Sequence, residues 1–146
     1  MILMAAVDYH SLNKETKKQL VDRTVAIVGD KWSLHVLGNL AFEESPLRFN
    51  QLMEKLRPIS SRTLSSKLAK LVEHGIVKKE IENASPPYNK YSLTEKGVDL
   101  VKALDAMAEW NMKWYGQPKP NPLRNIVGFA DDNTFYKAIN AKFPPK

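Results

Sequence analysis

The stretch that decides the fold is residues 60–75, which read SSRTLSSKLAKLVEHG. Its apolar residues recur at i, i+4, i+7 and i+8, the spacing of one buried helix face: Leu64, Leu68, Leu71 and Val72. Ser60 has the side chain of a good N-cap, and Gly75 stands where a helix commonly ends. We therefore predict a helix that begins after residue 60 and ends before residue 75.

The opposite face of this helix combines short hydroxyl side chains with long cations and has no acid before Glu73: Ser61, Arg62, Thr63, Ser65, Ser66, Lys67 and Lys70. A helix that enters a major groove needs small side chains where its backbone approaches DNA. It also needs Arg or Lys that reach base edges and phosphates. Taken alone, such a pattern is equally typical of a solvated polar face. The neighbouring elements favour nucleic acid.

Three shorter helices are predicted upstream, at residues 20–28, 31–42 and 49–56, with Asp30 as the N-cap of the second. Downstream the period changes: residues 76–81 are rich in β-branched side chains and residues 88–93 alternate, on either side of a Pro-containing turn. Thr94 is placed to cap a last long helix that ends near residue 114. Four helices, a hairpin and a helix predict a mainly α chain with a small β-hairpin (α+β), arranged as a winged helix-turn-helix.

The positive charge of the chain is concentrated around the decisive helix. The 146 residues carry 22 Lys and Arg against 16 Asp and Glu, a net charge of +6. Residues 45–79 hold eight basic and two acidic side chains, so this segment alone accounts for the surplus. A concentrated surplus is typical of a surface that meets phosphates. The hairpin residues Lys78, Lys79 and Lys90 fit contact with a DNA backbone or minor groove, and they fit edge-strand protection equally well.

Several classes of function are disfavoured. The chain has no Cys, which excludes disulfide scaffolds, thiolate metal sites and cysteine nucleophiles. Its three His residues stand apart from any metal-binding pattern, and no nucleotide-binding loop or catalytic triad can be picked out, so we expect no enzyme, no cofactor and no metal. The apolar start of residues 1–7 is too short for a signal peptide or a membrane span, so we expect a cytoplasmic protein without a membrane partner.

A set of short motifs in a fixed order resembles the HxlR-type winged-helix transcriptional regulators, which are MarR-like. The motifs cover about residues 19–115: Val21–Thr24, Val28–Ser33, Arg48–Leu52, Ile59–Ser65, Leu68, Leu71, Gly75, Pro87 and Tyr91–Gly97. The resemblance implies a prokaryotic homodimer that binds double-stranded DNA. It implies a recognition helix at residues 60–74, a wing at residues 76–93, and dimerisation through the first and last helices.

Two sets of candidate residues follow. The DNA-binding candidates are Arg48, Ser60, Ser61, Arg62, Thr63, Ser65, Ser66, Lys67, Lys70, Lys78, Lys79 and Lys90. The dimer candidates are Val21, Val25, Leu104, Met107, Ala108, Trp110, Asn111 and Trp114. Aromatic and Met side chains near the end of the last helix fit a protein interface, and an intramolecular core would explain them as well.

The sequence departs from the family in two places. Many members carry a Cys just before the Val-x-Arg-Thr motif, and some use it to sense oxidants; this chain has Lys18-Gln19-Leu20 there and no thiol. Residues 116–146 form a Pro-rich linker and a tail in which Phe135, Ile139 and Phe143 predict a short helix capped near Asp132. We therefore divide the chain into an N-terminal extension (1–18), the winged-helix domain (19–115) and this tail.

These patterns predict a sequence-specific DNA-binding transcriptional regulator that acts as a homodimer on a palindromic operator. The alternative is a winged-helix module that binds a protein and reads no DNA sequence, because a fold does not determine its function. Whether a small-molecule effector exists, and which one, is left open.

Overall fold

A computed structural model describes residues 7–43 and 46–117 of the chain. After a short 3-10 turn at Tyr9–Ser11, the elements in chain order are α1 (Lys14–Val28), α2 (Lys31–Phe42), β1 (Leu47–Arg48), α3 (Phe49–Lys55), α4 (Ser61–Glu73), β2 (Val77–Glu82), β3 (Tyr88–Leu93) and α5 (Glu95–Tyr115). The expected class, mainly α with a small β-hairpin in a winged helix-turn-helix, is confirmed.

The predicted N-caps are confirmed by their hydrogen bonds. Asp30 accepts the Ser33 amide at 2.9 Å, Ser60 accepts the Thr63 amide at 3.0 Å, and Thr94 accepts the Gly97 amide at 3.1 Å. Each cap satisfies an amide that has no partner within the first turn of a helix. Gly75 follows α4 with φ of 69°, a conformation that favours glycine.

The predicted start of the first helix is wrong. The helix begins at Lys14 rather than Leu20, and Asn13 caps it by accepting the Thr16 amide at 2.8 Å. The residues between Lys14 and Leu20 are polar, so they carry no apolar period that would extend the prediction.

The sheet has one strand more than the predicted hairpin. Its order is β1-β3-β2, antiparallel throughout, with Leu47 paired to Tyr91 and Arg48 to Lys90. β1 has only two residues, too few to show the alternation by which a strand is recognised in a sequence. We call β2, β3 and the turn between them the wing.

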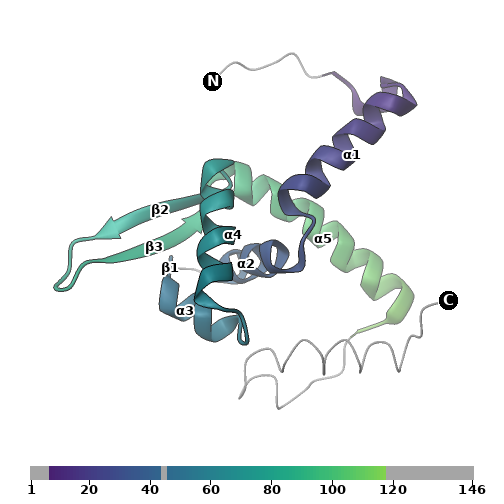
Figure 1. Ribbon diagram of the computed structural model, residues 1–146. Helices are drawn as coiled ribbons and strands as arrows, with labels where there is room; N and C mark the ends of the chain where they lie inside the picture. The colour runs from purple at the N-terminus through teal and green to yellow at the C-terminus, as the bar shows by residue number, and fades with distance from the viewer. Residues whose placement is uncertain (1–6, 44–45, 118–146) are drawn as a thin grey trace.

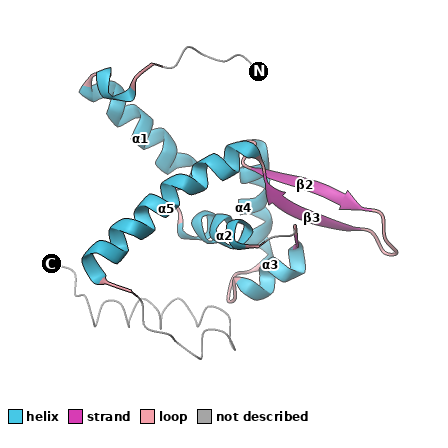
Figure 2. Cartoon of the chain, turned by 180° about the vertical axis from the view of Figure 1, so that it is seen from behind, coloured by secondary structure: helices cyan, strands magenta, loops and turns pink. Residues whose placement is uncertain are grey.

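The core lies between α2, α3, α4 and the base of the wing, which together form the body. Its fully buried side chains come from each of these helices and include Val36, Leu37, Leu52, Leu56, Leu64 and Leu71. The wing projects from one side of the body, and α1 and the far end of α5 project from the opposite side (Figures 1 and 2). This arrangement leaves the outer face of α4 open.

The last helix ends at Tyr115, and its C-cap Gly116 has a φ of 75°. The predicted linker and tail helix lie almost wholly outside the described residues. No helix in the described part is long and apolar enough to cross a membrane.

Candidate nucleic-acid interface

The outer face of α4 is the centre of the candidate interface. Leu64, Leu68 and Leu71 bury the inner face, and the hydrophobic pattern therefore points Ser61, Arg62, Ser65 and Ser66 outward, where all four are exposed. Arg62 makes no hydrogen bond or ion pair with any residue that the structure describes. It stands in the first turn of α4, whose free amides also favour an anion.

Ser60 and Thr63 have structural roles at the start of this helix. Ser60 caps α4 and also donates its hydroxyl hydrogen to Thr63 Oγ1 at 2.9 Å. Thr63 is half-buried. Both lie close to the predicted groove-facing residues, but their hydroxyls already have partners within the protein.

The two lysines of α4 point away from this face toward the junction of α1 and α2. Lys70 Nζ donates to the Ala26 carbonyl at 2.7 Å, and Lys67 Nζ lies 3.3 Å from Asp30 Oδ1. Burial raises the pKa of Asp30, but the hydrogen bonds from Ser33 and Lys67 outweigh it and hold the pKa below its usual range. The structure therefore separates these lysines from Arg62.

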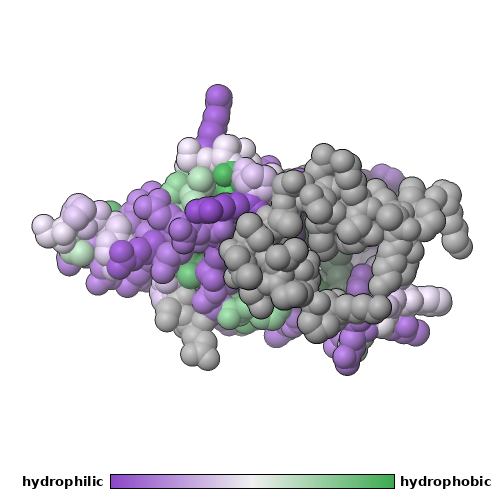
Figure 3. All heavy atoms as spheres, turned by 90° about the horizontal axis from the view of Figure 1, so that it is seen from below, coloured by the Kyte–Doolittle hydropathy of each residue, from purple (hydrophilic) through white to green (hydrophobic). Residues whose placement is uncertain are grey.

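Two of the wing cations are paired with acids of the wing. Lys78 lies 2.7 Å from Glu80, and Lys90 lies 2.6 Å from Glu82 and 3.8 Å from Glu80. Hydrogen bonding to Lys78 lowers the pKa of Glu80, and hydrogen bonding to Glu82 raises the pKa of Lys90. Antiparallel pairing puts these residues on one face of the wing, so its cations are largely neutralised there. Hydrophilic residues cover much of the wing in the space-filling view (Figure 3).

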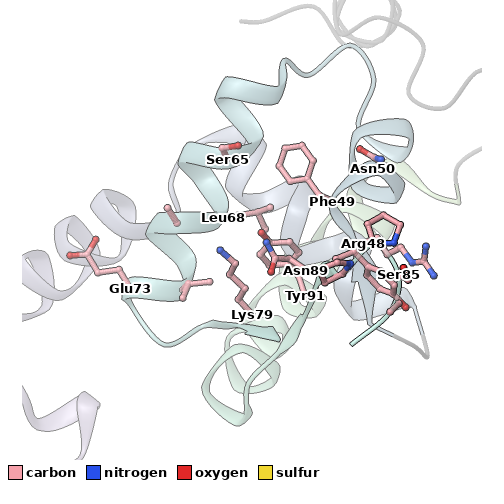
Figure 4. Close-up of a pocket in the computed structure, with 16 residues that line it drawn as sticks. Arg48, Phe49, Asn50, Ser65, Leu68, Glu73, Lys79, Ser85, Asn89 and Tyr91 are labelled. Carbon is pink, nitrogen blue, oxygen red and sulfur yellow. The ribbon is translucent and has the colours of Figure 1, made fainter. Parts of the chain in front are cut away.

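Arg48 and Lys79 are cations near the wing that no described acid pairs. The Arg48 guanidinium stacks over the Tyr88 ring, 3.7 Å from its centroid, and this contact holds a long side chain against the start of β3, next to the turn of the wing. Lys79 lies on the other face of β2, in register with Tyr91, and extends toward α4 (Figure 4). The sequence offered no signal for the Tyr88 contact, because the two residues meet only through the β1–β3 pairing.

A groove of about 980 Å³ separates α4 from the wing. Ser65, Ala69 and Glu73 line it from α4, Lys79 and Asn89 from the wing, and Arg48 and Asn50 from the start of α3 (Figure 4). The wall is therefore mixed: cations and amides stand at its rim, and Leu68, Val72 and Tyr91 form its floor.

The dimer candidates fall into two groups. Leu104 is half-buried and packs against the core, so it is at least partly an intramolecular residue. The others are exposed in the single chain, with Val21 at 54%, Val25 at 59%, Met107 at 58%, Trp110 at 56% and Trp114 at 66%. Ala108 and Asn111 are exposed as well. We call α1 and residues 105–115 of α5 the arms.

No group of three or more acidic or His side chains placed to hold a metal occurs within residues 7–43 and 46–117. Every buried side-chain polar atom in that part of the chain has a hydrogen-bond partner. The arrangement thus offers no metal centre there, and its conspicuous feature is an open helix face with a basic N-terminal end.

Comparison with known proteins gives a consistent picture. The model of the HxlR-like helix-turn-helix family matches residues 27–119. An uncharacterized HTH-type transcriptional regulator of Halalkalibacterium halodurans is 33% identical over 110 residues, 75% of this chain and 96% of that protein. Another, from Methanothermobacter thermautotrophicus, is 35% identical over 101 residues, 69% of this chain and 75% of that protein.

Solved structures agree with the fold. The crystal structure of a proposed MarR-family regulator from Enterococcus faecalis V583 superposes with a TM-score of 0.63 at 26% identity, and the match covers 74% of this chain and 94% of that one. The redox regulator HypR in its reduced form gives a TM-score of 0.59 at 31% identity, with 64% and 91% covered.

Proposed function

The chain belongs to the HxlR-like helix-turn-helix family of DNA-binding transcriptional regulators, and from this premise we propose that it acts in the cytoplasm as a homodimer on a palindromic operator. Each protomer would insert α4 into a major groove and rest its wing on the adjacent backbone or minor groove. The two half-sites would then be about one helical turn apart.

The observation that carries this proposal is the exposed face of α4. Arg62 combines a full charge with freedom from any described partner, and Ser61, Ser65 and Ser66 leave room for the helix backbone to approach DNA. We assign base-edge or phosphate contact to Arg62 and close backbone approach to the three serines.

At the wing we assign DNA contact first to Arg48 and Lys79. Lys78 and Lys90 would have to give up an acid partner to bind a phosphate. This exchange contributes less binding free energy than a phosphate contact by a cation that has no acid partner. The groove between α4 and the wing provides the space in which a DNA strand would lie between these cations and the helix.

The arms support the homodimer. Val, Met and Trp side chains are exposed on these helices. The helices project from the body (Figure 2). Surfaces rich in Trp and Met are typical of interfaces, and closed two-fold dimers are the commonest soluble assemblies. A two-fold dimer presents its recognition helices symmetrically, which is why we expect a palindrome.

Oxidation of a Cys thiol cannot be the signal that regulates this protein. HypR is described as a redox regulator, but this sequence contains no Cys that could be oxidised. If an effector exists, we propose that it is a small molecule recognised by non-covalent contacts.

The experiment is a fluorescence-anisotropy titration of a labelled duplex selected by the wild-type protein. Arg62→Ala should weaken binding roughly five- to hundredfold, the loss typical of one base or phosphate contact by Arg. Lys102→Ala removes the same charge from a paired cation on α5, and it should change affinity less than about twofold.

Two results would contradict the proposal. An unchanged affinity of Arg62→Ala would remove α4 from the interface. Equal binding of selected and random duplexes, with little dependence on salt, would favour a protein-binding module instead.

A further inference from the structure

We propose that Lys67 and Lys70 are positioning residues, which hold the recognition helix against the α1–α2 junction and thereby set the distance between the two recognition helices of the dimer. This inference rests on the proposed dimer and its DNA binding. It gives the two lysines a function that differs from the phosphate contact expected from their sequence pattern.

Lys70 completes the end of a neighbouring helix. The last carbonyls of any α-helix have no amide partner within it and carry partial negative charge. α1 has no basic residue in its last turn, and the Ala26 carbonyl receives its hydrogen bond from Lys70, 44 residues further along the chain, at 2.7 Å. The ammonium group of α4 therefore takes the place of the C-terminal cation that α1 lacks.

Lys67 is attached to the beginning of the next helix. Its partner Asp30 is the N-cap of α2 and also accepts the hydroxyl of the fully buried Ser33 at 2.7 Å. The side chains of Lys67 and Asp30 are 26% and 34% exposed, so solvent screens this pair less than the surface pairs of α1 and α5. The carboxylate cannot turn toward solvent without losing its bonds to Ser33.

The two lysines contact both sides of a short junction. They stand at i and i+3, on one side of α4, and together reach the end of α1 and the start of α2. Between those helices lies Gly29, where a Cβ atom would collide with the Val25 carbonyl. Of the residues of α1 only Val28 is buried, and Ile27 packs against the core beside it, so apolar contacts hold only the last turn of this arm. Lys70 adds a polar contact between the end of this arm and the recognition helix, and Lys67 adds one between the recognition helix and the start of α2.

The test measures the geometry of the dimer directly. Because the chain has no Cys, Ser66→Cys provides one labelling site on the outer face of α4 in each protomer. Electron–electron resonance between nitroxide labels then gives the distance between the two recognition helices without DNA. We expect a narrow distance distribution in the labelled protein and a broader or shifted one when Lys67→Met and Lys70→Met are added. Lys70→Arg keeps a charged donor, so the labelled protein with this change should keep the narrow distribution.

DNA binding separates a positioning residue from a phosphate contact. We expect Asp30→Asn and Lys67→Met each to weaken binding about fivefold at the preferred half-site spacing, the scale of one solvent-accessible hydrogen bond, and to relax discrimination among duplexes whose spacing differs by one base pair. The slope of log affinity against log salt should stay the same. Asn keeps the oxygen that accepts the Ser33 amide, so the Asp30 variant removes the charge while the N-cap of α2 remains.

Each contrary outcome has a separate meaning. If Asp30→Asn strengthens binding, and Lys67→Met or Lys70→Met lowers the salt slope by about 0.9 at every spacing, the lysines contact phosphates and the inference is overturned. An unchanged distance distribution in the double Met variant also overturns it, while leaving the proposed function intact. If no distance between protomers is detected at all, or the wild-type protein selects no duplex, the proposed homodimeric regulator itself fails.

Discussion

The body and the arms of this molecule bury their apolar side chains in different ways. In the body, α2, α3, α4 and the sheet enclose leucines that are almost fully buried. In the arms, α1 buries only Val28, and every residue of α5 from Asp105 to Tyr115 is exposed. α5 belongs to both: its first half packs Leu100 and Leu104 on the core, and its second half leaves the body. The body thus buries its apolar side chains within one chain, whereas the arms leave theirs exposed, as the proposed dimer requires.

The largest effect is expected in the body. Leu64→Ala removes a side chain that is 0% exposed and leaves a cavity, which should lower the free energy of unfolding by about 2–5 kcal/mol. Urea denaturation followed by circular dichroism measures this loss, and the loss measured for this variant should be the same at all protein concentrations. Met107→Ala in the arm serves as the matched control, with a loss that depends on protein concentration. If both variants lost the same free energy of unfolding at every protein concentration, the arms would be stabilised in the same way as the body.

A smaller effect is expected where the arms associate. Trp110→Ser together with Trp114→Ser should raise the dimer dissociation constant by at least about thirtyfold, because buried Trp residues are frequent hot spots worth about 2 kcal/mol or more. Sedimentation velocity over a range of concentrations measures the constant, and Lys102→Ala, on the same helix, should leave it unchanged. A dimer that survives both Trp changes would place the interface elsewhere.

The smallest effect concerns the junction between arm and body. Folding lowers the pKa of Asp30, so its carboxylate contributes stability above about pH 4 that is lost as the pH falls through the lower pKa of the folded state. The Tm of the wild-type protein should therefore exceed that of Asp30→Asn near pH 7, and the difference should shrink toward pH 3. A difference that stays constant over this range would show that the charge of Asp30 contributes nothing.

Much of the body could be predicted from local patterns. The buried face of α4 is predicted by the spacing of Leu64, Leu68 and Leu71. Helix starts are predicted by the N-cap side chains of Asp30, Ser60 and Thr94. Such signals are local and need no knowledge of the fold. The polar start of α1 and the two-residue β1 carry no comparable signal, and both were missed or misplaced.

The candidate interface was predictable in its position but less so in its electrostatics. The outward face with Arg62 follows from helical periodicity alone. The partners of Lys67 and Lys70 lie on other helices, so only the tertiary structure reveals them. At the wing, a count of charges that ended at Lys79 left out Glu80 and Glu82, which the sheet brings against Lys78 and Lys90.

Gly97 marks the place where α5 meets the wing. This buried residue lies so close to the Ile76 carbonyl that a Cβ atom would collide with it, so the start of α5 is held where the wing begins. From there to Tyr115 the helix extends for about 27 Å at the usual rise per residue. If α5 tilted by about 5° about Gly97, its far end would move by roughly 2 Å. The same helix thus joins the proposed dimer surface at its far end to the base of the wing at its start.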